Sequence, residues 1–102
     1  MKHIILACAG GMSTSLLMNK MKAAAKARGV EVDIQAMSVN AFEKYKGEVD
    51  ILLLGPQLGH RAGQMRQKCD PLGIKVDVVN MTDYGMMNGE KVLDTALAAL
   101  ES

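Results

Sequence analysis

One cysteine, Cys8, heads a segment whose residue types suit phosphate chemistry. Two glycines, Gly10 and Gly11, follow it, and three consecutive hydroxyl residues occupy positions 13–15. Glycines permit positive φ angles and close backbone approach, so successive N–H groups of such a loop can surround an anion. A thiolate beside an anion site is a nucleophile that can take up a phosphoryl group.

The loop is therefore expected to bind phosphate, with Cys8 as the nucleophile. A helix begins near residue 13, and its N-terminus favours both an anion and a thiolate in front of it. The residues predicted to bind phosphate are Ala9, Gly10, Gly11, Met12, Ser13, Thr14 and Ser15.

The elements that must position this loop alternate between strand-like and helix-like hydrophobic periods. Apolar runs or alternation predict strands at 3–8, 30–36, 49–54 and 74–78. Helical spacing predicts helices at 13–28, 39–46, from 58 to about 70, and 92–100. Residues 81–87 are expected to form a loop.

This βα alternation predicts a single α/β domain over residues 1–102. Strands at 3–8 and 49–54 are continuously apolar and therefore central, whereas the other two alternate and lie at the edges. With right-handed crossovers, the strand order is 2-1-3-4. The fold class is a flavodoxin-like doubly wound, four-stranded parallel sheet with helices on both faces. Cys8 and the phosphate-binding loop after strand 1 lie at its switch point.

Composition argues against several other functions. The net charge of +1 and three aromatic residues disfavour a nucleic-acid partner. Cys8 and Cys69 lie far apart and form no CxxC pair, so no disulfide is expected. His3 and His60 lie in separate segments, so no metal site is expected. We also expect no cofactor. No apolar run reaches the roughly 18 residues of a membrane span, and the N-terminus is a poor secretory signal. We expect a cytoplasmic protein without direct membrane insertion.

A small tyrosine phosphatase is the main alternative for the cysteine loop. Its signature resembles C-x5-R-[ST], but Thr14 occupies the arginine position before Ser15. Without that guanidinium, hydrolysis of a phosphocysteine is expected to be slow. Asp70 and Pro71 imitate the acid motif of such enzymes, but they are predicted at the opposite end of the sheet. Nucleotide P-loop and dinucleotide motifs are absent.

Three segments resemble a known family: "CAGGMSTSLL" after the first strand, "ILLLGPQ" at the third, and "YG" before the C-terminal helix. They are similar to the IIB component of the lactose/cellobiose/diacetylchitobiose class of bacterial phosphotransferase systems. The resemblance implies a cytoplasmic phosphocarrier that associates with a membrane permease. Its cysteine, Cys8 here, would receive phosphate from a IIA phosphohistidine. It would pass the phosphate to a β-linked disaccharide or oligosaccharide held by the IIC permease.

Protein partners must dock over the loops that surround Cys8. The predicted rim consists of Gln57, Leu58, Tyr84 and Met86. Asp83 is interpreted as a solvated turn residue and His60 as a surface or partner-contact residue. The segment "LGHRAGQM" departs from what the resemblance leads us to expect, which leaves the partner and the sugar open.

Overall fold

The computed structural model describes residues 1–8 and 12–101, with the backbone alone for 12 and 13. Its centre is a four-stranded parallel sheet in the order β2-β1-β3-β4. This confirms the predicted order, with the two continuously apolar strands in the middle. The strands are β1 (Lys2–Cys8), β2 (Val32–Ser38), β3 (Ile51–Leu54) and β4 (Lys75–Val78).

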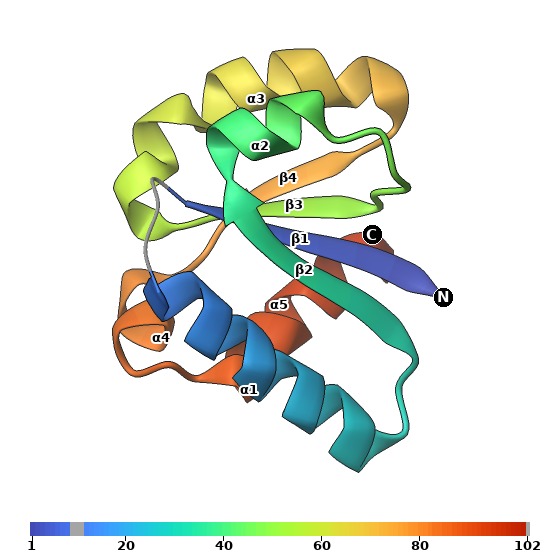
Figure 1. The fold of residues 1–102 in the computed structure, drawn as a ribbon, viewed down its shortest axis with the longest axis vertical. Coiled ribbons are helices and arrows are strands. Elements are labelled where there is room, and N and C mark those ends of the chain that lie inside the picture. Colours follow the sequence, from blue (N-terminus) through green and yellow to red (C-terminus); the bar gives the residue numbers. More distant parts are fainter. Residues whose placement is uncertain (9–11, 102) are drawn as a thin grey trace.

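Helices cover both faces of the sheet (Figure 1). On one face lie α1 (Met12–Arg28), α4 (Met81–Gly85) and α5 (Gly89–Glu101), and on the other α2 (Val39–Lys44) and α3 (Ala62–Cys69). Short 3-10 segments, η1 (Pro56–Arg61) and η2 (Asp70–Leu72), flank α3. In the central strand β1, Ile4 and Leu6 join the core beneath α1 and α5, whereas Ile5 and Ala7 join the core beneath α2 and α3. Among the helices described, none combines the length and the apolar character that a membrane crossing requires.

β2 starts two residues later than its hydrophobic pattern predicts, because the end of α1 uses those residues. Gly29 has a φ of 68° and donates its N–H to the Lys26 carbonyl at 3.2 Å. Val30 donates its N–H to the Ala25 carbonyl at 2.9 Å. These two bonds form a Schellman motif, in which Val30 packs on the core before the strand begins at Val32.

The predicted loop at 81–87 is wrong, because residues 81–85 form α4. The side chain of Asn80 caps this helix and accepts hydrogen bonds from the N–H groups of Thr82 and Asp83 at 2.9 and 3.1 Å. Asparagine at this position satisfies N–H groups that the first turn leaves without partners.

Candidate functional site

Cys8 ends the central strand β1, between the carboxyl ends of β2 and β3. Only 6% of the residue is exposed, and its register partner in β2 is Ser38. It borders a hollow of about 180 Å³. The described residues lining this hollow are Cys8, Ser38, Val39, Asn40, Leu58 and Arg61. The thiol thus lies at the switch point of the doubly wound sheet, where ligands bind in such folds.

Most of the predicted phosphate loop falls outside the described residues. Ala9, Gly10 and Gly11 are not described, nor are the side chains of Met12 and Ser13. The backbone of α1 begins at residue 12, three residues after the loop starts. A long helix therefore starts directly beyond the loop that follows Cys8, as the residue pattern predicts.

Thr14 and Ser15 lie in the first turn of α1 but differ in environment. Ser15 is exposed, whereas only 3% of Thr14 is exposed. The Thr14 hydroxyl lies 3.3 Å from the hydroxyl of Tyr84 in α4, so the two oxygens share a buried hydrogen bond. The Thr14 side chain therefore joins α1 to α4, a contact that the prediction of phosphate binding did not include.

Two of the four predicted rim residues are exposed and two are buried. Gln57 and Met86 are exposed, with 71% of Met86 accessible at the end of α4. Leu58 is buried and borders the Cys8 hollow. Tyr84 differs from the expected surface contact, because it packs in the core beneath α4 with 9% exposed. Its hydroxyl serves the contact to α1 instead.

Gly55 continues the pairing of β3 with β1 next to Cys8. Its N–H donates to the Ala7 carbonyl at 2.9 Å, which continues the β1–β3 pairing. A Cβ at this position would lie 3.6 Å from the Cys8 Cβ and 3.0 Å from the Gln57 Oε1. A Cβ at Gly55 would thus make an ordinary contact with Cys8 and crowd only the movable end of the Gln57 side chain.

Sequence reasoning missed three polar residues beside Cys8: Ser38, Asn40 and Arg61. The Ser38 hydroxyl caps α2 by accepting the Ala41 N–H at 3.0 Å. The Arg61 guanidinium lies 3.6 Å from the Glu43 carboxylate. A signal for Arg61 was available, since it belongs to the atypical segment that follows β3 toward the switch point.

Other titratable candidates lie away from the hollow. Asp70 and Cys69 stand where α3 ends and the chain returns to the amino end of β4, opposite to Cys8. Burial raises the pKa of the Cys69 thiol above its ordinary value, and the nearby Asp70 carboxylate adds to this. His60 is exposed in η1, and Asp83 is half-buried in α4. Within the described chain, no three His, Cys, Asp or Glu side chains are grouped to hold a metal ion.

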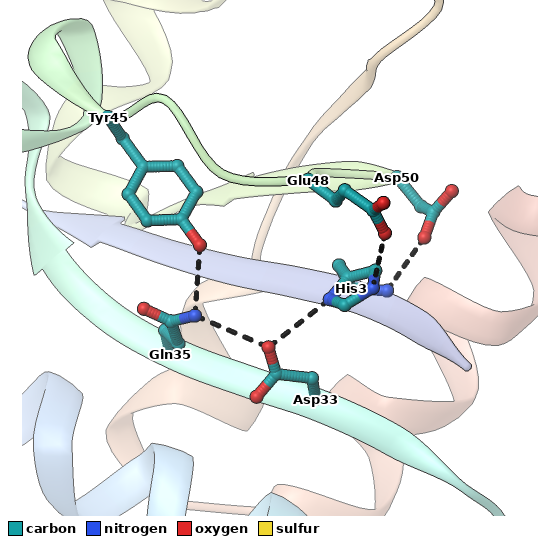
Figure 2. Close-up of polar contacts among 6 residues, drawn as sticks. All are labelled: His3, Asp33, Gln35, Tyr45, Glu48 and Asp50. Atoms are coloured by element: carbon teal, nitrogen blue, oxygen red, sulfur yellow. Dashed lines mark hydrogen bonds and ion pairs between the residues drawn. The ribbon is translucent and has the colours of Figure 1, made fainter.

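A second polar cluster, also missed from the sequence, surrounds His3 at the amino end of the sheet (Figure 2). The two ring nitrogens of His3 lie 3.2 Å from Asp33 and 2.9 Å from Glu48. The His3 backbone N–H donates to Asp50 at 2.7 Å. Hydrogen bonds from His3 and then Gln35 lower the pKa of the Asp33 carboxyl. This cluster ties the ends of β1, β2 and β3 together.

The chain is similar to known proteins over nearly its whole length. A family model described as "PTS system, Lactose/Cellobiose specific IIB subunit" matches residues 3–95. The chain is 44% identical over 100 residues to the PTS system galactose-specific EIIB component of Lactococcus lactis subsp. cremoris, covering 93% of each chain.

Of two further relatives, one is about as long as this chain and the other is much longer. The solution structure of a cellobiose-specific phosphotransferase IIB component from Borrelia burgdorferi is 34% identical. It superimposes with a TM-score of 0.78 over 98% of this chain and 92% of that one. A PTS system lactose-specific EIICB component of Lactococcus lactis subsp. lactis is 32% identical over 74 residues, which are 72% of this chain but 13% of that protein.

Proposed function

Because this chain belongs to the lactose/cellobiose-specific IIB family of the phosphotransferase system, we propose that it carries a phosphoryl group on Cys8. The donor is a phosphohistidine of a IIA protein, and the acceptor is a sugar bound by a IIC permease. The observation that carries the proposal is the position of Cys8. It ends β1 at the switch point, borders a hollow and precedes the N-terminus of a 17-residue helix.

The chemistry consists of two displacements at phosphorus. In the first, the Cys8 thiolate attacks the phosphohistidine, the S–P bond forms, and the N–P bond breaks with its electron pair left on the imidazole. In the second, a sugar hydroxyl attacks the phosphocysteine, and the S–P bond breaks to return the thiolate. The hydroxyl proton leaves to a base supplied by the permease. Backbone N–H groups ahead of α1 stabilise charge on the phosphoryl oxygens in both steps.

A carrier function explains the surroundings of Cys8 better than hydrolysis does. The position that a phosphatase loop gives to arginine is Thr14, which is buried against Tyr84. Asp70, the imitation of a phosphatase acid, stands at the other end of the sheet. A leaving group would thus find no proton from Asp70. A carrier benefits from the separation of Asp70 from Cys8 because it must hold phosphate without losing it to water.

We infer the partners from the family and from the placement of Cys8. Since only 6% of Cys8 is exposed, a donor histidine must come close over the rim and exclude water. The matching part of the lactose-specific EIICB relative belongs to a far longer protein, which supports a partner of the IIC type for this chain. We place the protein in the cytoplasm, in association with that permease. The relatives are named for different sugars, so we assign the choice of sugar to the permease.

Transfer to sugar tests this function. The chain is first phosphorylated with phosphoenolpyruvate, the general phosphotransferase proteins and a IIA protein, and then purified. Membranes containing a IIC permease are added with cellobiose, lactose or galactose. We expect phosphate to leave the protein and to appear as sugar phosphate with at least one sugar. Turnover of an aryl phosphate well above the buffer rate, with no sugar phosphate formed, would instead establish a phosphatase.

A further inference from the structure

The hollow beside Cys8 has six described lining residues, and the one charged residue among them, Arg61, comes from outside the phosphate loop. Ser38 and Asn40 are polar residues, whereas Val39 and Leu58 are apolar. The hollow has a volume of about 180 Å³. A water molecule in the liquid occupies about 30 Å³, so the hollow has room for several atoms of that size. One cationic residue and two polar residues beside such a space suit an anion bound to the thiol.

The ion pair of Arg61 is built so that it can open. Its guanidinium lies 3.6 Å from Glu43, beyond ordinary hydrogen-bond distance. The same Glu43 oxygen lies 3.1 Å from the Lys68 ammonium. Glu43 therefore keeps a cationic partner when Arg61 moves away. All three side chains are at least 30% exposed, and exposed pairs of this kind are weak.

On the basis of the phosphocysteine function proposed above, we propose that Arg61 binds the phosphoryl group on Cys8. When phosphate arrives, the guanidinium leaves Glu43 and donates to the phosphoryl oxygens. A phosphate monoester carries about −1.5 to −2 charges at neutral pH, and a guanidinium pairs with two of its oxygens at once. The positive charge that Thr14 does not supply thus comes from η1. Glu43 and Lys68 remain paired behind it.

If Arg61 binds the phosphoryl group, it should stabilise phosphorylated Cys8 and favour the doubly ionised form of its phosphoryl group. Without Arg61, the equilibrium constant for transfer from the IIA phosphohistidine to Cys8 should fall about fivefold to tenfold. The second ionisation of the phosphoryl group should also move to higher pH, because a nearby cation favours the more negative form. A residue that acts only through folding would not move this ionisation.

The test compares Arg61→Gln with matched controls. Lys68→Gln removes a cation from the same Glu43 carboxylate without touching the hollow, and His60→Gln removes the neighbouring titratable side chain of η1. Each protein is phosphorylated through IIA, the phosphorylated fraction at equilibrium is measured by intact mass, and the phosphoryl group is titrated by ³¹P NMR. We expect the lower phosphorylated fraction and the higher ionisation midpoint in Arg61→Gln and in neither control. Arg61→Lys, which keeps the charge but not the fork, should lie between Arg61→Gln and the wild type.

The outcomes separate this inference from the function on which it rests. If wild type takes up phosphate on Cys8 and Arg61→Gln matches it in both measurements, Arg61 has no phosphoryl-binding role. An equal change in Lys68→Gln would also overturn the proposal, since it would trace the effect to bulk charge. If wild type itself acquires no phosphate on Cys8, the proposed function fails and the role of Arg61 fails with it.

Discussion

Replacing Gly89 with alanine should destabilise the fold by forcing α5 away from α1. A Cβ at this position would lie 2.6 Å from the Lys20 carbonyl carbon and 2.7 Å from the Met21 backbone nitrogen. Ordinary contact begins at 3.4 Å, so the helices must separate locally by about 0.8 Å. Backbone atoms cannot turn aside as a flexible side chain can. The strain therefore reaches Val92 and Leu93, which α5 buries in the core.

The size of the loss follows from overpacking. Forcing an extra methyl group into a packed site costs about 1–3 kcal/mol, against which the better helix propensity of alanine returns at most about 1 kcal/mol. We expect a net loss of about 1–2 kcal/mol, or roughly 5–15 °C in Tm for a domain of this size. The assay is thermal and urea unfolding followed by circular dichroism.

Gly63→Ala in α3 is the matched control, because a Cβ there meets no atom within 4 Å. It should stabilise the protein by about 0.5–1 kcal/mol through helix propensity alone. A Gly89→Ala protein as stable as wild type would show that the close approach of α1 and α5 does not require glycine. An equal loss of stability in Gly63→Ala would show that the loss at Gly89 does not come from that approach.

Further predictions concern three other residues. The pKa of Asp33 is held below its ordinary value of 3.8, first by the hydrogen bond with His3. The ionised carboxylate thus stabilises the fold above that pH, and the stability gap between wild type and Asp33→Asn should shrink as pH falls below 3.8. Urea unfolding across that range measures the gap, and a constant difference would contradict the role of the pair. Because burial raises the pKa of Cys69, iodoacetamide should label this thiol slowly in the folded protein at neutral pH. Cys69→Ser should still accept phosphate, and a folded variant that does not would contradict its placement. Tyr84→Phe removes the hydroxyl 3.3 Å from Thr14 Oγ1 and should cost about 1–2 kcal/mol by leaving that buried oxygen without this partner. Unchanged unfolding in Tyr84→Phe would show that the contact contributes nothing.

The architecture was predictable because burial on both faces leaves a plain signal. The run Ile51–Leu54 is apolar at every position and is fully buried as β3. β4 alternates and lies at the edge with every residue half-buried. The errors occur where a few polar contacts decide the backbone. Asn80 caps α4, a helix too short to show a hydrophobic period, and Gly29 delays the start of β2 through bonds that hydrophobicity does not encode.

Of the candidate site, the position of Cys8 was predictable from the sequence, whereas most of its surroundings were not. Cys8 ends β1, and the strand order that the hydrophobic pattern predicts already places this end at the switch point. The surroundings depend on distant segments that come together in three dimensions. Thr14 turns toward Tyr84, which sequence reasoning placed on the surface. Arg61 borders the same hollow as Cys8 although no motif links them.

Phosphate on Cys8 is the claim on which the function depends, and intact mass measures it most directly. Wild type, Cys8→Ser and Cys69→Ser are incubated with phosphoenolpyruvate, the general phosphotransferase proteins and a IIA protein, and then analysed at neutral pH. We expect wild type and Cys69→Ser to gain the mass of one phosphoryl group and Cys8→Ser to gain none, with peptide mapping that locates the group on Cys8. A phosphoryl group that persists in Cys8→Ser, or that maps to another residue such as His60, would contradict the claim.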